Sequence, residues 1–383
     1  MIALGPLCTD MYLPALPGLV HYFDSDLPTV QYTLSAYLFG FGISQLFYGS
    51  AADHFGRRPV LLFGMAVFLL STLGCTLAPS IGLLILFRLL QAIGVGAGGV
   101  ICRAIVRDIY GPSDSARIFS YMSSAVAVAP VVAPLVGGFL TSWFSWRAVF
   151  GFLAIVGAVV TWEFHRSIPE SVPRAGTTSF NLATLLRNKR FLLGERRFIG
   201  YVLCFTFTFT GLFTYVSSSP HVLIGFMGVK TEYFGLYFSL PVFGFIFGTQ
   251  TGARLHYRFS NERLIGTGIM LVAAGTLLML VFALAGSRNP FTVVLPQLVY
   301  LFGAGMSQPR VLSAAMAPHP HIAATASALM GFIQITFASV VVAALGYVQG
   351  ESPVPMALTM CATSVLTLFA FHAFVRRDAR STA

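Results

Sequence analysis

The sequence repeats one pattern from end to end: an apolar run of about 20 residues, followed by a short polar or basic break. A helix rises 1.5 Å per residue, so about 20 apolar residues can cross the roughly 30 Å hydrocarbon core of a bilayer. Hydrophobic residues make up 56% of the 383 and charged residues only 9%, whereas a soluble domain has roughly 25% charged residues. The chain is therefore predicted to be an all-α polytopic membrane protein.

Twelve runs are long enough to span the membrane, in two groups of six. They lie near residues 2–20, 31–51, 59–78, 81–105, 117–141, 147–165, 198–219, 233–253, 263–285, 291–312, 322–348 and 354–375. The longest polar segment separates the groups, which predicts an N-terminal six-helix half (1–165), a cytosolic linker (166–197) and a C-terminal half (198–383). In the linker, "SFNLATLLRNKRF" is expected to form a short amphipathic helix on the membrane surface. Two such halves are typical of transporters that bind substrate near the bilayer midplane between them.

Basic residues concentrate on one side of this topology. With the N-terminus inside, 19 of the 23 Lys and Arg residues fall in cytosolic ends and loops, and only Arg147, Lys230 and Arg288 fall on the other side. Because cytosolic loops carry the excess of Lys and Arg, both termini are predicted to be cytosolic, in an inner (plasma) membrane. The net charge of +10 then indicates topology, and no nucleic-acid partner is expected.

Several other classes of protein find little support. The five cysteines lie in apolar segments without CxxC spacing, which indicates neither a disulfide framework nor a metal site. No nucleotide-binding loop, HExxH motif or Ser/His/Asp set is present, so an enzyme is not expected and a polytopic receptor is the weaker alternative. His319 and His321 are expected to be solvated loop residues. The first residues lack a signal-peptide pattern, so we expect a retained first span, and the abrupt start leaves room for a short cytosolic tail before Met1.

One carboxylate and two prolines interrupt the first span, in "TDMYLPALP". Asp10 lies about 14 Å along this helix, close to the middle of the membrane. A carboxylate there is costly to ionise, so a change in hydration or in a neighbouring charge can make it bind or release a proton. Pro14 and Pro17 free backbone carbonyls that a cavity can use. Asp10 is thus the candidate proton and substrate residue; the alternative is an aspartate that only caps the helix break.

Arg88, in the fourth span, is the other charge well inside the membrane. Gln91 follows one turn later, so both side chains are expected to face a cavity. Arg88 is the candidate for proton coupling, and Gln91 is a candidate for substrate binding. The alternative is a snorkelling arginine that anchors this span to the backbone of the first. Three aromatic residues, Tyr12, Tyr37 and Phe41, are candidates for lining the substrate site, although aromatics in this chain can equally face lipid or the protein core.

The short connection "GSAADHFGRRPVL" between the second and third spans could simply anchor the chain by its positive charge. It also resembles the loop signature of the major facilitator superfamily. The matching residues are Gly49, Asp53, Gly56, Arg57, Arg58 and Leu61, and the departures are Ser50, Ala51 and His54. The resemblance implies a cytosolic gate, and Asp108 after the fourth span is available to pair with Arg57 or Arg58 and so to latch the outward-open state. The alternative is exposed ion pairs worth under about 1 kcal/mol.

Four further stretches are similar to drug:proton antiporters of the bicyclomycin and chloramphenicol/florfenicol exporter type: "DMYLPALP", "RLLQAIGVGAGGVICRAIVRD", "APVVAPLVGG" and "SSSPHVLIGFMGV". This resemblance implies that Asp10 and Arg88 correspond to the membrane-embedded acidic and basic residues of that subfamily. It implies efflux of a small-molecule drug, driven by a proton gradient without a cofactor, by a protein that we expect to be a monomer. A proton-coupled metabolite or nutrient carrier is the alternative, because a fold does not fix its substrate.

The fifth span carries the stretch that the resemblance associates with export. Pro130 and Pro134 weaken backbone hydrogen bonding, and Gly137 and Gly138 let another helix approach closely. The outer half of this span could therefore bend and seal. The alternative, ordinary packing glycines and tolerated prolines, stays open from the sequence.

Overall fold

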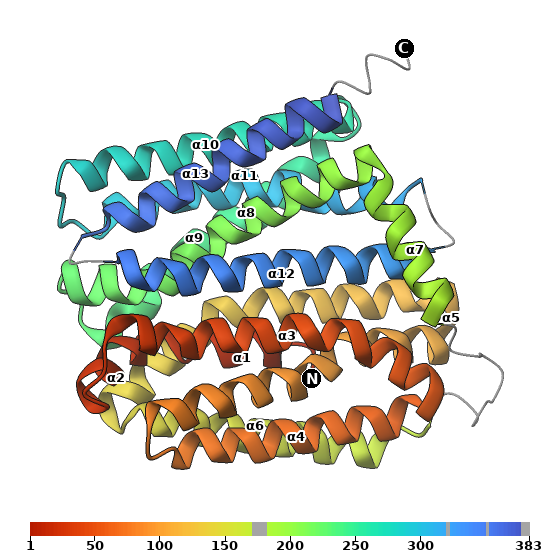
Figure 1. Cartoon of the computed structure of the whole chain (residues 1–383), viewed down its shortest axis with the longest axis horizontal. Coiled ribbons are helices and arrows are strands. Elements are labelled where there is room, and N and C mark those ends of the chain that lie inside the picture. Colours follow the sequence, from red (N-terminus) through yellow and green to blue (C-terminus); the bar gives the residue numbers. More distant parts are fainter. Residues whose placement is uncertain (171–181, 319–321, 350–351, 377–383) are drawn as a thin grey trace. The chain divides into compact units, whose positions relative to one another are not determined.

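The computed structural model describes residues 1–170, 182–318, 322–349 and 352–376, which are almost entirely helical. The chain divides into two compact units, Met1–Phe180 with Thr231–Gly235, and Asn181–Lys230 with Leu236–Ala383. Within each unit most of the elements are long helices (Figure 1). His319 and His321 lie outside the described residues. The six-and-six division with a linker at 166–197 stays a prediction.

The N-terminal unit begins with a broken span and continues with four long helices. Its elements are α1 (Leu4–Asp10), the 3-10 helix η1 (Leu13–Ala15), α2 (Leu16–Tyr22), α3 (Leu27–Phe55), α4 (Arg57–Leu77), α5 (Ile81–Trp143) and α6 (Trp146–Ser167). Local capping fixes two of the starts: the Thr29 backbone N–H donates to the Asp26 carboxylate, and that of Leu83 donates to the Ser80 hydroxyl. Glycines let the helices approach closely; Gly94 of α5, for example, lies against the backbone of Phe68 in α4.

The first span is interrupted where the prolines predict it. The α-helix ends at Asp10, and a 3-10 turn that contains Pro14 precedes the helix α2, which contains Pro17. Because proline lacks a backbone N–H and its ring clashes with the preceding turn, it cannot continue an α-helical ladder unbroken. The residues around the break are buried, with Met11, Tyr12 and Leu13 at most 1% exposed.

The fourth and fifth predicted spans belong to one helix, which differs from the expectation of two separate helices. Helix α5 runs without interruption over 63 residues, a length of about 95 Å if it were straight and about three times the hydrocarbon thickness. It therefore supplies two spans, Ile81–Tyr110 and Arg117–Trp143. The polar residues between them keep helical hydrogen bonds, so the connection that the sequence marks by its polarity is not a break in the backbone.

The helices of the C-terminal unit are α7 (Leu182–Gly194), α8 (Arg196–Pro220), the π-helix η2 (His221–Phe226), α9 (Thr231–Leu255), α10 (Asn261–Leu284), α11 (Phe291–Met316), α12 (Ala323–Val348), α13 (Val354–Ala370) and the π-helix η4 (Phe371–Arg376). The first residues of α9, Thr231–Gly235, belong to the N-terminal unit. One core of the C-terminal unit packs α8, α10, α12 and η4 around Phe198, Ile265, Met330 and Phe371. Helix α7 falls in the segment predicted to form a surface helix; that it lies on the membrane stays a prediction.

Eight helical segments among the described residues are long and apolar enough to cross a membrane. They are Arg57–Leu77, Ile81–Tyr110, Arg117–Trp143, Trp146–Ser167, Arg196–Phe226, Asn261–Leu284, Thr325–Val348 and Val354–Val375. Helices α3, α9 and α11 are less apolar but have 29, 25 and 26 residues, which is also long enough. With the broken first span these segments make twelve, and they confirm an all-α, twelve-span, multi-pass membrane protein.

Candidate functional site

Arg88 is the centre of a buried polar cluster in the N-terminal unit. Its side chain is fully buried (0% exposed) on α5. One guanidinium nitrogen, Nη1, donates to the carbonyl of Cys8 at 3.0 Å and to the Gln91 side-chain oxygen at 2.7 Å. Nε and Nη2 have no hydrogen-bond partner among the described residues. The buried Arg88 guanidinium therefore keeps two nitrogen atoms, Nε and Nη2, available to donate to another acceptor.

Aromatic rings provide the rest of the surroundings of this charge. The Arg88 Cζ atom lies 4.2 Å from the ring centroid of Tyr37, 4.7 Å from that of Tyr12 and 5.8 Å from that of Phe150. Ring faces carry partial negative charge and attract a guanidinium, more strongly when water is excluded. Stacking on several rings needs the flat guanidinium of arginine, so lysine is not an equivalent residue at this position.

Gln91 extends the cluster to a third helix. It is fully buried, accepts from Arg88, and donates from Nε2 to the Thr72 hydroxyl of α4 at 2.9 Å. The Thr72 hydroxyl in turn donates to the carbonyl of Phe68 at 2.6 Å. The geometry thus fixes the orientation of the guanidinium through Gln91; that Gln91 also contacts substrate stays a prediction.

Asp10 is the last residue of α1, and its side chain is 7% exposed. It comes two residues after Cys8, whose carbonyl holds Arg88. The ion pairs among the described residues join Asp53 and Asp108 to Arg57, and Glu262 to Arg197, so Asp10 forms none with Arg88. A nearly buried carboxylate outside any such pair is costly to keep ionised, and this is the property expected of a group that binds a proton reversibly.

The three predicted lining aromatics lie near the broken span. The Tyr12 hydroxyl bonds to the Thr33 hydroxyl at 2.8 Å, and the Tyr37 hydroxyl donates to the Gly5 carbonyl at 2.9 Å. Phe41 stacks with Tyr37 at a centroid distance of 6.5 Å. Tyr12 and Tyr37 are buried around the Arg88 cation, which the sequence did not predict. That these aromatics also line a substrate site stays a prediction.

The fifth-span motif lies directly against the break. A Cβ atom at Gly137 would meet the backbone carbonyl of Met11, the residue after Asp10. Only glycine permits this close approach of α5 to the first span. Pro134 and Gly138 are buried and Pro130 is partly buried in the same helix, which continues through both prolines. That this segment seals the outer side stays a prediction.

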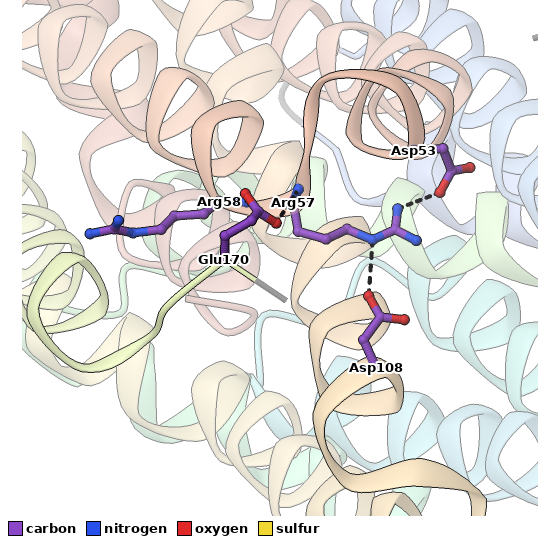
Figure 2. A network of polar contacts seen from close by, with 5 residues as sticks. All are labelled: Asp53, Arg57, Arg58, Asp108 and Glu170. Carbon is purple, nitrogen blue, oxygen red and sulfur yellow. Dashed lines mark hydrogen bonds and ion pairs between the residues drawn. The ribbon is translucent and has the colours of Figure 1, made fainter. Parts of the chain in front are cut away.

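A second polar network lies at the start of α4 (Figure 2). The Arg57 side chain points between two carboxylates, with 2.5 Å between its Nη1 and Asp53 and 3.1 Å between its Nε and Asp108. Asp53 belongs to the end of α3 and Asp108 to α5, so Arg57 links three helices. Of the two arginines that could pair with Asp108, it is Arg57 that does so. Gly49 of α3 and Gly56, the residue between α3 and α4, are both partly buried.

Glu170, which the sequence did not single out, completes this network. Its two carboxylate oxygens accept the backbone N–H groups of Arg57 at 3.0 Å and of Arg58 at 3.1 Å. These N–H groups belong to the first turn of α4 and therefore have no acceptor within the helix, and the helix dipole also favours an anion there. Gly56 has φ +97°, a backbone conformation that favours glycine, and a Cβ atom there would also push against the Glu170 carboxylate.

Arg58 points away from Arg57 and bonds to α6 (Figure 2). Its Nη2 donates to the carbonyl of His165 at 2.8 Å. The two adjacent arginines thus tie α4 to different neighbours. One signal for Glu170 is present in the sequence: it is one of only two acidic residues in an otherwise basic linker. Thr72 gives no comparable signal, because a threonine in an apolar span is unremarkable.

Among the described residues, no group of three or more His, Cys, Asp or Glu side chains is placed to hold a metal ion. The buried polar groups of the N-terminal unit are instead a fixed cation surrounded by neutral donors and acceptors and, apart from its hydrogen bonds, a nearly buried carboxylate. That these groups move a proton and recognise a ligand stays a prediction.

Comparison with known proteins gives matches over most of the chain. A sequence profile described as "Major Facilitator Superfamily" matches residues 1–346. Multidrug resistance protein D of Escherichia coli (strain K12) is 33% identical over 334 residues, which cover 87% of this chain and 83% of that protein. A chloramphenicol resistance protein of Pseudomonas aeruginosa is 30% identical over 332 residues, 85% of this chain and 77% of that protein.

The structural likeness extends further than the sequence likeness. The crystal structure of a D-xylose-proton symporter matches with a TM-score of 0.76 and 18% identity, and covers 98% of this chain and 96% of that one. At this identity the match concerns the fold alone.

Proposed function

The chain belongs to the Major Facilitator Superfamily, and on this premise we propose that it exports small, partly apolar drugs in exchange for protons. Its substrate site would open alternately to the two sides of the membrane. Two relatives named for multidrug and chloramphenicol resistance support a drug as the exported compound. The expected class of substrate is phenicol-like or bicyclomycin-like.

The observation that carries the proposal is a buried fixed charge on the fourth span together with a nearly buried carboxylate on the first. Arg88 is fully buried and held by Cys8, Gln91 and ring faces. A guanidinium stays protonated in proteins, so Arg88 supplies a fixed positive charge. Asp10 is nearly buried at a break in the helix and belongs to none of the ion pairs of the described residues. It is therefore the group whose charge can change.

The exchange follows from these roles. When Asp10 is ionised, its negative charge partly balances Arg88 and favours a bound drug that has cationic or hydrogen-bond-donating groups. A proton that enters from outside neutralises Asp10, removes this attraction and leaves the drug free to dissociate. Release of the proton to the cytosol restores the first state. Drug and proton thus compete for one carboxylate, which is the condition for exchange rather than cotransport.

We further propose that both termini face the cytosol in a bacterial inner membrane and that the protein acts as a monomer. The excess of Lys and Arg on one side supports the orientation. The ion pairs of Arg57 with Asp53 and Asp108 would then lie on the cytosolic side, where their formation and rupture would accompany opening and closing.

The test is export of a drug panel from cells that produce the chain, with and without a proton uncoupler. We expect lower accumulation of at least one phenicol or bicyclomycin-like compound, and loss of this protection with the uncoupler. The Asp10→Asn variant, present in the membrane at the same level, should give no protection. Protection that survives the uncoupler would refute proton coupling, and export of metabolites without any drug would favour the nutrient-carrier alternative.

A further inference from the structure

The C-terminal unit contains an open pocket of about 370 Å³ near the ends of α9 and α11. Its polar lining residues are Thr249, His256, Asn261, Arg310 and Ser313. All five can donate hydrogen bonds, and no described residue that lines the pocket is acidic. A concave site with donors and a cation but no carboxylate is suited to an oxyanion.

Arg310 provides the charge. It donates from Nη1 to the carbonyl of Met306 at 2.8 Å, which holds the guanidinium in place beside Gly252. Its Nε is buried and has no hydrogen-bond partner among the described residues. This donor is unsatisfied within the described part of the protein, and a buried unsatisfied donor is costly. Arg310 also lines the pocket, which places its side chain beside an oxyanion bound there.

The connection between α9 and α10 adds to the positive potential. Arg254, Arg258 and Arg263 are all exposed there. The acidic residue of the same stretch, Glu262, is engaged by Arg197, with 3.7 Å between the charged atoms. Two aromatic residues are exposed beside these cations, Tyr257 (91%) and Phe259 (44%). Exposed aromatics next to basic residues are typical of the membrane interface, where basic pockets bind anionic lipid headgroups.

We propose that this pocket binds a phosphate group, and that its source is the headgroup of an anionic phospholipid in the cytosolic leaflet. The guanidinium of Arg310 would contact the phosphate oxygens, Asn261 and Ser313 would donate to it, and the exposed aromatics would lie among the lipid chains. The site is separate from Asp10 and Arg88, which belong to the other unit. The inference therefore does not depend on the export function.

The test is native mass spectrometry of the purified full-length protein titrated with phosphatidylglycerol, with phosphatidylcholine as the neutral lipid. We expect selective binding of phosphatidylglycerol that Arg310→Gln weakens about fivefold or more. The matched control is Arg254→Gln, which removes one charge from the same surface but outside the pocket and should have a smaller effect. Equal losses in the two variants would show a diffuse surface charge and overturn the proposal.

A second pair of variants avoids the risk that Arg310→Gln disturbs folding. Ser313 is exposed, so Ser313→Asp should insert and fold while it places a negative charge in the pocket; Ser313→Asn has a similar size without the charge. Only the aspartate should weaken binding. Inorganic phosphate distinguishes a lipid headgroup from free phosphate as the ligand. If phosphate competes with phosphatidylglycerol for binding, the phosphate chemistry of the pocket is confirmed. If the protein binds phosphate but not phosphatidylglycerol, the lipid assignment is overturned. Unchanged lipid binding by Ser313→Asp overturns the site.

Discussion

The two units place polar groups in corresponding helices but use different chemistry. In the N-terminal unit, Gln91 on the fourth span accepts from the charged Arg88 and donates to Thr72 on the third span. In the C-terminal unit, Thr276 on the third long helix bonds to Ser364 at 2.9 Å. On the fourth, Tyr300 donates to the carbonyl of Thr208. These C-terminal groups are buried and uncharged.

This difference indicates where proton coupling can reside. In the described part of the C-terminal unit, no acidic residue lies beyond the first turn of a helix. Hydroxyl and amide groups can bind a ligand, but they do not change charge near neutral pH. The described histidines of this unit, His221, His256 and His372, can change charge there, but they follow the ends of α8, α9 and α13 rather than lie within these helices. The N-terminal unit has both a fixed cation and a titratable carboxylate. We therefore infer that coupling belongs to the N-terminal unit and that the C-terminal unit contributes neutral hydrogen bonds.

The largest effect is expected for Asp10→Asn. Asparagine keeps the size and polarity of the side chain but cannot release a proton, so proton-driven drug transport into inverted membrane vesicles should fall to the level of vesicles without the protein. Asp10→Glu should retain part of the activity. In the C-terminal unit, Tyr300→Phe removes one neutral hydrogen bond and should leave coupling intact.

The pair of variants tests the comparison itself. Transport by Asp10→Asn that still responds to a pH gradient would remove the N-terminal assignment. Loss of proton coupling in Tyr300→Phe, at a normal level of folded protein, would show that both units take part.

The next effect is expected for Arg88→Lys. Lysine keeps the charge, and its nitrogen can donate to Cys8 and Gln91, but it lacks the planar group that lies over the rings of Tyr12 and Tyr37 and the further donors Nε and Nη2. Export should fall on the order of tenfold, and Arg88→Ala should be worse. The control is Arg254→Lys, a conservative change at an exposed site. Equal export by Arg88→Lys and the parent protein would favour a role in anchoring alone.

Much of this arrangement follows from the sequence. The uncharged runs predicted the spans for two reasons. A helix that crosses the hydrocarbon core needs about 20 mostly apolar side chains, and its backbone polar groups must be hydrogen-bonded within the helix. Asp10 and Arg88 stood out because a charge in such a run is costly and needs a reason. The prolines predicted the break after Asp10 because their covalent structure forbids a regular helix.

Other features depend on tertiary contacts that the sequence does not encode locally. Gln91 donates to Thr72 only because α4 and α5 pack against each other at these two residues. Glu170 meets Arg57 across 113 residues of chain, and no local pattern gives that proximity. The expected break between the fourth and fifth spans fails for a related reason: polarity shows where a chain leaves the membrane, not whether its backbone stays helical there.

A smaller effect is expected at the glycine that contacts the broken span. A side chain at Gly137 would overlap the Met11 carbonyl, so Gly137→Leu should push α5 away from the break, at a cost of about 1–3 kcal/mol in stability. Export should slow several-fold and protons should leak. The measurement is acidification inside vesicles without drug. Gly151→Leu in α6 is the matched control, because no atom lies within 4 Å of the position of a Cβ at Gly151.

Pro134→Ala acts on the same segment in a different way. It restores a backbone N–H and stiffens α5 without adding bulk. Slow export without a proton leak would indicate that the bend is needed for movement. If both span-five variants export normally and remain proton-tight, this segment is ordinary packing and the directional argument for export is lost.

The smallest effect concerns how the two units begin their third span, which is α4 in the N-terminal unit and α10 in the C-terminal unit. Helix α4 starts on the carboxylate of Glu170, which is remote in sequence, whereas α10 starts on its own Ser260, whose hydroxyl accepts the Arg263 N–H at 3.4 Å. Loss of either cap should cost about 1 kcal/mol, seen as a lower midpoint of thermal unfolding. Only Glu170→Ala should also alter export, since only this cap joins α4 to the linker beside Arg57 and Asp108. Glu170→Gln, which keeps an acceptor oxygen, should lie between. A similar decline in export for Ser260→Ala would mean that both caps act through stability, and that the linker contact has no separate part in gating.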